Sequence, residues 1–232
     1  MSLTILAVVT ARGGSKRLPG KNLRPLGGRP LIVWSIEVVK GIEAVVDTLV
    51  STDDPTIAAV ARDAGALAPW LRPAELAADT SSSADVCLHA LDWYEQHRGP
   101  VDGLLLLQPT SPFRRRDTVE RGIDMFARNE RRPVLGVGAA ASHPMHCFRL
   151  EGQALRPYLE GGTQQRTQDL TAAYVLNGGF YLIAPHDLRE RRAFYAADAL
   201  ALLSVHPEES IDIDTEWDWQ VAETVLGRQV LP

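Results

Sequence analysis

Short apolar runs rich in valine and leucine alternate with longer stretches of helical pattern through the first 138 residues. The candidate strands cover residues 3–9, 48–51, 103–107 and 134–137, and the candidate helices cover residues 30–39, 55–64, 82–96 and 118–128. Strands that are apolar on both faces and separated by helices are typical of a mostly parallel sheet with helices on both sides. We therefore predict that residues 1–138 form a doubly wound α/β sheet.

The pattern changes after residue 138. Shorter β-rich pieces, at 146–150, 155–158 and 174–183, are separated by turns that contain glycine. A final helix is predicted at about residues 215–226. We interpret residues 1–232 as a single domain in which residues 139–184 form a small lobe, a candidate dimerisation arm.

The loop after the first strand is strongly basic. Residues 11–22 read A-R-G-G-S-K-R-L-P-G-K-N, with four cations and no acidic residue. Ligands of open α/β sheets bind outside the carboxyl ends of the strands, and Gly13 and Gly14 allow backbone N–H groups to approach an anion closely. Only three of the 24 basic residues are lysines, and two of these, Lys16 and Lys21, lie in this loop. The loop is therefore a candidate phosphate site.

Other interpretations of the glycine-containing segments are less favoured. The first loop lacks the Walker pattern, because Ser15 stands where the first glycine belongs and Asn22 follows Lys21. A solvated basic loop is the simplest alternative. Residues 136–141 match a loose dinucleotide-binding pattern, but Pro144 prevents a long helix from starting there.

Two carboxylates near the C-terminus form a candidate metal site. Asp212 and Asp214 alternate with Ile211 and Ile213 in an extended run, so both carboxylates can point into one space while the isoleucines face the core. Two like charges so close repel unless a cation lies between them, and Mg²⁺ prefers such oxygen ligands. The alternative is that Asp214 or Thr215 is the N-cap of the last helix.

Composition excludes several classes of protein. A hydrophobic content of 45% rules out a disordered chain, and a net charge of −5 disfavours a nucleic-acid partner. Cys87 and Cys147 are each expected to fill a core, which fits a reducing, cytoplasmic location. No apolar run reaches the roughly 20 residues of a membrane helix, and residues 1–11 are expected to be a strand rather than a signal peptide.

Four blocks together resemble one known family. They read A-R-G-G-S-K-R-L-P-G-K-N (11–22), L-R-P-A-E-L-A-A-D-T-S-S-S (71–83), L-L-Q-P-T-S-P (106–112) and S-I-D-I-D-T-E (210–216). In this order they resemble the acylneuraminate cytidylyltransferases, also called CMP-sialic acid synthetases. The resemblance implies a Rossmann-like fold with a small dimerisation lobe and a homodimer. It also implies Mg²⁺-dependent transfer of CMP from CTP to a nine-carbon α-keto sugar acid, with release of pyrophosphate.

The resemblance assigns a role to each matching position. Lys21 and Arg12 are the implied catalytic residues, with Lys21 near the α-phosphate. The implied CTP-binding residues are Arg12, Gly14, Ser15, Lys16, Asn22, Arg72 and Ser83; the sugar-binding residues are Gln108, Arg166 and Tyr181; and the metal ligands are Asp212 and Asp214. Simpler roles are open for three of them: Arg72 could brace a turn, Ser83 could cap a helix, and Gln108 could end a strand.

The chain departs from the family on the sugar side. Many members carry two arginines before Gln-Asp-Leu, whereas Arg166 is followed here by Thr167, and Val175 stands where many carry arginine. The family implies N-acetylneuraminate or a relative as the acceptor. The loss of these two cations argues against a plain copy of the sialic acid pocket, and so favours a diamino relative such as legionaminate or pseudaminate. The alternatives are a CMP-Kdo synthetase, whose first loop also tends to read Arg-Leu-Pro-Gly-Lys, and a non-catalytic nucleotide-binding regulator, which would not need the carboxylate pair.

Overall fold

The computed structural model describes residues 3–78, 80–160 and 166–230. Its centre is a six-stranded sheet in the order β10-β6-β9-β5-β1-β4. The strands are β1 (Ile5–Thr10), β4 (Val45–Ser51), β5 (Gly103–Leu107), β6 (Val134–Ala139), β9 (Tyr174–Ile183) and β10 (Leu200–Leu203). β9 is antiparallel to both of its neighbours, β5 and β6, and all other neighbouring pairs are parallel. The predicted mostly parallel α/β sheet is confirmed, with one reversed strand inside it.

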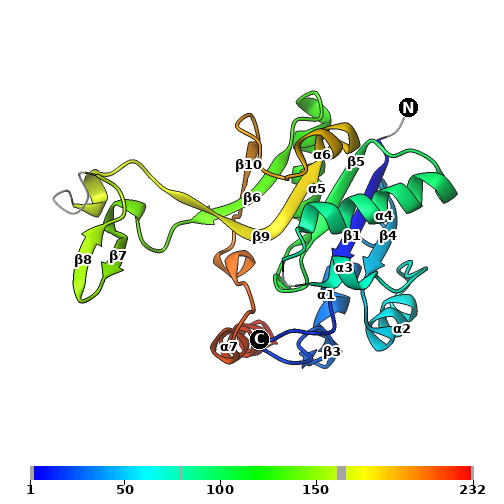
Figure 1. Ribbon diagram of the computed structural model, residues 1–232, viewed down its shortest axis with the longest axis horizontal. Coiled ribbons are helices and arrows are strands. Elements are labelled where there is room, and N and C mark those ends of the chain that lie inside the picture. The colour runs from blue at the N-terminus through cyan, green and yellow to red at the C-terminus, as the bar shows by residue number, and fades with distance from the viewer. Residues whose placement is uncertain (1–2, 79, 161–165, 231–232) are drawn as a thin grey trace.

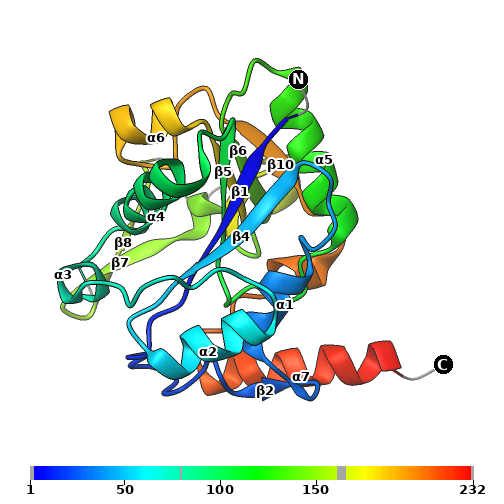
Figure 2. The same ribbon diagram turned by 90° about the vertical axis from the view of Figure 1, so that its right-hand side faces the viewer.

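Helices cover both faces of this sheet (Figure 2). One face packs against α1 (Leu31–Glu37), α2 (Pro55–Asp63) and α5 (Arg116–Arg128), and the other against α4 (Ser83–Arg98) and α6 (Pro185–Arg191). Within β1, Ile5, Ala7 and Val9 belong to the first core, whereas Leu6 and Val8 belong to the second. Because successive side chains of a strand point to opposite faces, a continuous apolar run fills two cores at once.

The four predicted helices are all present, and local signals explain where two of them begin. Asp54 is the N-cap of α2, its carboxylate accepting from the backbone N–H of Thr56 at 2.7 Å, and Pro55 follows in the first turn. Ser82 is the N-cap of α4 and accepts from the N–H of Asp85 at 3.0 Å. Such caps satisfy backbone donors that the first helical turn leaves without partners. The chain also forms the short helix α3 (Ala74–Ala77), which with α6 and β10 was not predicted.

The last helix, α7 (Glu216–Val230), lies beside the first loop (Figure 1). It packs there with the small ribbon of β2 (Pro25–Leu26) and β3 (Arg29–Pro30). A third apolar cluster joins these segments; its buried members are Leu18, Leu26, Leu31, Phe113, Ile213, Trp219 and Ala222. This cluster holds the C-terminal acidic segment against the opposite end of the chain. The predicted last helix is confirmed, and the 3₁₀ turn η3 (Pro207–Ser210) precedes the acidic segment.

The range 139–184 is not a separate unit throughout. The hairpin of β7 (Phe148–Glu151) and β8 (Ala154–Pro157) is exposed and lies far from the central sheet (Figure 1), with η1 (Pro144–His146) and η2 (Thr167–Asp169) beside it. β9 begins exposed, but its residues from Asn177 onward are mostly buried inside the central sheet. Of the described residues in this range, only those before β9 therefore project. We call residues 140–160 and 166–173 the arm.

The two cysteines differ in their surroundings. Cys87 is buried on α4, as expected, and burial raises the pKa of its thiol. Cys147 is exposed in the arm, so the expectation that it fills a core was wrong. Both thiols are free. Among the described residues, no helix is both long enough and apolar enough to span a bilayer.

Candidate active site

A cavity of about 490 Å³ opens at the carboxyl ends of β1 and β5. Its walls come from the first loop, from residues 72–86, from the loop after β5 and from the acidic segment before α7. The sequence-predicted residues that line it are Arg12, Ser15, Lys16, Lys21, Asn22, Arg72, Ser83, Gln108, Asp212 and Asp214. Residues separated by almost 200 positions thus share one space, at the edge where ligands of α/β sheets bind.

Two contacts hold the first loop in place. The backbone N–H of Gly13 donates to Asp53 Oδ1 at 2.9 Å, and Asn22 Nδ2 donates to the carbonyl of Arg12 at 2.9 Å. A Cβ atom on Gly13 would lie 2.9 Å from Asp54 Oδ2 and 3.0 Å from Asp54 Cβ, so a larger residue would displace the loop or the Asp54 side chain. A Cβ atom on Gly14 would meet nothing within 4 Å. Packing within the protein therefore does not explain why residue 14 is a glycine.

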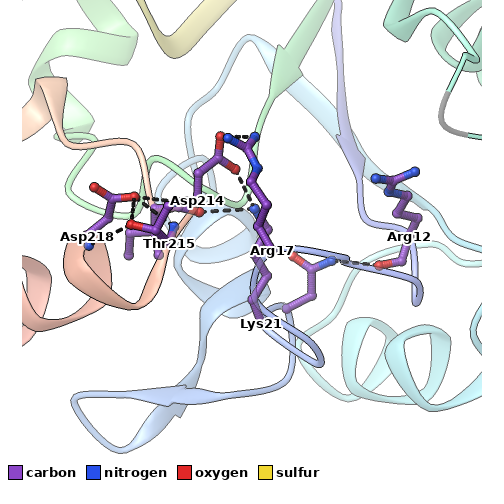
Figure 3. A network of polar contacts seen from close by, with 8 residues as sticks. Arg12, Arg17, Lys21, Asp214, Thr215 and Asp218 are labelled. Atoms are coloured by element: carbon purple, nitrogen blue, oxygen red, sulfur yellow. Dashed lines mark hydrogen bonds and ion pairs between the residues drawn. The ribbon is translucent and has the colours of Figure 1, made fainter.

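Lys21 and Arg17 converge on Asp214 (Figure 3). Lys21 Nζ lies 2.9 Å from Asp214 Oδ1 and donates to the carbonyl of Ile213 at 3.0 Å. Arg17 Nη2 approaches the other carboxylate oxygen of Asp214 at 2.5 Å, but its side chain is 67% exposed. The Lys21 side chain is only 12% exposed, so its contact is the less screened of the two.

The acidic segment turns its carboxylates to the cavity by burying Ile213 between them. Ile213 is fully buried, and its backbone N–H donates to the carbonyl of Thr110 at 2.8 Å. Residues 211–214 belong to no strand, but the alternation is kept, since Ile213 is buried and Asp212 is exposed. Partial burial raises the pKa of Asp212 even though its side chain is open to the cavity, and the charge of Asp214 raises it further.

Thr215, rather than Asp214, caps α7. Thr215 Oγ1 accepts from the backbone N–H of Asp218 at 3.3 Å, and Asp218 Oδ2 accepts from the N–H of Thr215 at 2.7 Å (Figure 3). This reciprocal pair satisfies the backbone N–H groups of Thr215 and Asp218 at the start of the helix. Asp214 is therefore not needed as a cap, and its carboxylate faces the first loop and the cavity.

Arg72 and Ser83 form another wall of the cavity. Arg72 is 7% exposed, and its Nε donates to Ser51 Oγ at 3.0 Å. A second nitrogen of the guanidinium bonds the carbonyl of Ser51, and burial lowers the Arg72 pKa while the charge of Asp53 opposes this effect. Ser83 lies one residue beyond the cap Ser82, so its hydroxyl is not used for capping.

The three residues assigned to the sugar are not brought together. Gln108 lines the cavity, whereas Tyr181 and Arg166 do not. Tyr181 is half-buried on β9, and its pKa is raised by burial and by the charge of Asp212. Arg166 lies in the arm, where its exposed side chain is 3.5 Å from Asp169. Within one chain, Arg166 is not part of the cavity.

Comparison with known proteins identifies the family. Residues 6–131 match the cytidylyltransferase family. The chain is 36% identical over 226 residues to the CMP-N,N'-diacetyllegionaminic acid synthase of Legionella pneumophila, covering 97% of each chain. This chain belongs to the cytidylyltransferase family. The predicted resemblance to the acylneuraminate cytidylyltransferases is thereby confirmed.

Other relatives of this cytidylyltransferase are more distant. The pseudaminic acid cytidylyltransferase of Campylobacter jejuni (serotype O:2) is 32% identical, with 76% of each chain covered. The N-acylneuraminate cytidylyltransferase of Escherichia coli is 28% identical over 99% of this chain, which spans 54% of that longer protein. A solved CMP:2-keto-3-deoxy-manno-octonic acid synthetase complexed with CTP superposes with a TM-score of 0.71 at 18% identity, covering 98% of this chain and 100% of the other. This last likeness supports the fold alone.

Several residues that support this candidate site were not predicted from the sequence. Asp53 fastens the first loop, Thr110 fastens the acidic segment, and Arg114 is buried behind the loop after β5. Asp53 could have been found, because it follows the second predicted strand at the edge where ligands bind. Nothing local in the sequence distinguishes Arg114 from its neighbours Arg115 and Arg116.

Proposed function

We propose that this protein transfers CMP from CTP to the anomeric hydroxyl of a nine-carbon α-keto sugar acid and releases pyrophosphate. The observation that carries the proposal is that the cationic first loop and the carboxylate pair line one cavity. Groups that suit a polyanion and groups that suit a divalent cation are thus adjacent. The 36% identity to a CMP-N,N'-diacetyllegionaminic acid synthase over nearly the whole chain supports the same reaction.

Charge compensation is the main task of such a site. CTP and the sugar acid are both anions, and two unit charges 4 Å apart repel by roughly 4 kcal/mol at an effective dielectric constant of 20. Arg12, Lys16 and Lys21 lie where they would offset this repulsion. Lysine acts as a movable point charge, whereas arginine can hold two phosphate oxygens at once.

The carboxylate pair suits Mg²⁺. Asp212 and Asp214 offer hard oxygen ligands on one side of the cavity. Burial and the charge of Asp214 both disfavour the ionised form of Asp212, so a divalent cation there would relieve a charge that the protein compensates only in part. Such a cation would supply Lewis-acid stabilisation of the phosphate oxygens. We propose Asp212 and Asp214 as its ligands.

The chemical step needs little covalent participation by the protein. The acceptor hydroxyl attacks the α-phosphorus, the new O–P bond forms as the bond to pyrophosphate breaks, and the hydroxyl proton leaves to solvent. We assign to Lys21 and Arg12 the stabilisation of charge on the α-phosphate, and to Gln108 the orientation of the sugar. None of the described histidines lines the cavity.

The preferred acceptor is proposed to be a diamino nine-carbon acid of the legionaminic or pseudaminic type. Relatives named for both acids are 36% and 32% identical to this chain. The sequence also lacks the second arginine before Gln168 and has Val175 in place of another. Both departures lie on the sugar side implied by the family, where they would alter recognition of the acceptor.

A substrate panel tests the reaction and the acceptor. Pyrophosphate release is measured with CTP, ATP, GTP or UTP and with N,N'-diacetyllegionaminate, pseudaminate, N-acetylneuraminate or Kdo, each with and without Mg²⁺. We expect CTP to be preferred and a diamino acid to give the highest kcat/KM. Turnover of Kdo alone would refute the proposed acceptor. Turnover of no sugar acid, with CTP still bound, would favour a nucleotide-binding regulator.

We also propose that the protein is a homodimer in which the arm of one subunit lies near the cavity of the other. Large apolar side chains are exposed on the arm and the adjoining part of β9, among them Leu150 (73%), Leu155 (61%) and Tyr174 (54%). Such clustering is typical of an interface, and Arg166 would then contribute to the partner's site. Light scattering of the double variant Leu150→Glu/Leu155→Glu should report monomers, and an unchanged dimer would contradict this arrangement.

The free thiols fit the proposed cytoplasmic location.

A further inference from the structure

Arg114 is a buried arginine that follows the loop after β5. Only 7% of the residue is exposed. Its guanidinium donates to the carbonyl of Gln108 at 2.8 Å, to Ser35 Oγ at 3.1 Å and to the carbonyl of Gly179. Because arginine presents its donors in a rigid planar fork, this one side chain fixes the relative positions of α1, β9 and the loop that carries Gln108.

The irregular part of β9 that Arg114 holds also lies against the side chain of Gln108. Gly178 has a φ of +73°, and a Cβ atom there would lie 2.9 Å from Gln108 Oε1. The next residue, Gly179, is the one whose carbonyl Arg114 holds. Arg114 thus constrains Gln108 in two ways. It bonds the backbone carbonyl of Gln108, and it holds Gly179, whose neighbour Gly178 lies against the side-chain amide of Gln108. Gln108 itself lines the cavity.

A second buried charge, Glu209, connects the same region to the acidic segment. Glu209 is 3% exposed and accepts from the backbone N–H groups of Arg115 and His206. Arg114 and Glu209 line one small internal cavity. Burial lowers the Arg114 pKa and the charge of Glu209 raises it, and an arginine in this setting remains protonated. Glu209 stands three residues before Asp212 in the chain.

Two buried charges are poor devices for stability, because the cost of taking them out of water can exceed their mutual attraction. Their arrangement here joins the two sides of the candidate active site. Arg114 bonds the carbonyl of Gln108, and Glu209 lies three residues before Asp212 in the chain. The backbone bond of 2.8 Å from Ile213 to Thr110 links the acidic segment to the loop after β5. We propose that Arg114, balanced by Glu209, is a positioning residue that sets the placement of Gln108 relative to Asp212. The proposal rests on the proposed function for the identity of the acceptor.

The test compares Arg114→Lys with Arg116→Lys. Lysine keeps the charge but loses the fork. Arg116 is a matched control two residues away, because its exposed guanidinium also bonds two backbone carbonyls, those of Lys40 and Gly41, but does not line the cavity. Glu209→Gln is a second variant that keeps the shape and removes the charge. Steady-state kinetics are measured below the melting temperature of each variant, and CTP binding is measured by calorimetry without acceptor.

We expect Arg114→Lys to lower kcat and raise the acceptor KM, with a combined loss of about 10- to 100-fold in kcat/KM. Glu209→Gln should change the same constants in the same direction. CTP affinity should stay within about twofold of the wild type, because Arg12, Lys16 and Arg72 are not held by Arg114. Arg116→Lys should change neither. A folded Arg114→Lys with wild-type kcat and acceptor KM, or one in which CTP affinity falls equally, would overturn the proposal.

Hydrogen exchange provides a readout that does not depend on turnover. Backbone amides of residues 108–114 and 209–214 should exchange faster in Arg114→Lys and Glu209→Gln than in the wild type and Arg116→Lys. Unchanged exchange in both segments would refute the positioning role even if the sugar acid were misidentified. Conversely, faster exchange in a protein that turns over no nonulosonic acid would retain the positioning role and reject the proposed function.

Discussion

Lys21 donates to Asp214 at 2.9 Å across 193 positions of sequence. The same ammonium also donates to the carbonyl of Ile213. The lysine proposed to lie near the α-phosphate and the carboxylate proposed to bind the metal are therefore direct partners, so the two proposed sites are electrostatically coupled.

Replacing Lys21 should impair turnover more than stability. Lys21→Met removes the positive charge that we propose stabilises the α-phosphate, and we expect kcat to fall by about 100-fold or more, comparable to the loss of one transition-state donor. Lys40→Met is the matched control, because Lys40 is exposed and does not line the cavity. Pyrophosphate release at saturating CTP measures both variants. Equal activity of the two would reject the role of Lys21.

Because the pKa of Asp212 is raised, replacing this residue by a neutral one should stabilise the protein by an amount that depends on pH. Burial makes the folded protein hold this proton more tightly than the unfolded chain, whose ordinary value is 3.8. The stability contributed by the protonated group is fully present below that value and is lost as pH rises through the folded pKa. Asp212→Asn should therefore melt above the wild type at pH 7 without Mg²⁺, and the difference should shrink towards pH 4.

Thermal melts with Mg²⁺ complete the test of Asp212. The wild type should gain melting temperature on addition of Mg²⁺ with CTP, because a ligand stabilises the state that binds it. Asp212→Asn should gain less. A difference between the two proteins that is independent of pH would contradict the burial argument, and equal gains with Mg²⁺ would contradict the ligand assignment.

The cap of α7 makes a separate prediction about stability. Thr215→Ala removes the side chain that accepts from the N–H of Asp218 and should lower the free energy of unfolding by about 1 kcal/mol. Thr224→Ala is the control within the same helix, where the hydroxyl only donates to the carbonyl of Gln220 and the expected change is within about 0.5 kcal/mol. Urea denaturation of both variants measures these changes in the free energy of unfolding. Equal losses in the two variants would show that the cap at Thr215 does not stabilise the helix.

Local patterns predicted most of the fold because the core depends on periodicity. The continuous apolar run of β1 identified a strand covered on both faces, and the helices predicted at 55–64 and 82–96 begin in the structure at Pro55 and just after the cap Ser82. The direction of β9 was not predictable, because its apolar pattern is the same whichever way it runs in the sheet. The short β10 pairs only with β6, at one edge of the sheet, and its few residues give a weak signal.

The candidate site was predictable where chemistry is concentrated in a short stretch. The first loop and the acidic segment each gather like charges within a few residues, and a charge run of that kind can be read without knowing the fold. Arg114 and Glu209 escaped prediction for the opposite reason. Each is one charged residue among several, and its meaning depends on contacts such as that between Glu209 and Arg115, 94 positions apart. Burial of a single charge is a tertiary property.

The adjacent glycines of the first loop should respond differently to alanine. In Gly13→Ala the new Cβ would lie 2.9 Å from Asp54 Oδ2, so either the loop or Asp54 must shift, and we expect the bond from the residue 13 N–H to Asp53 to weaken. We expect CTP affinity to fall about tenfold and the melting temperature to drop. In Gly14→Ala the Cβ meets no protein atom within 4 Å, so the melting temperature should not change. Any loss of CTP affinity in that variant then reports the close approach of the nucleotide itself. Calorimetry with CTP and thermal melts of both variants separate the two effects, and a destabilised Gly14→Ala would show that the loop packs differently.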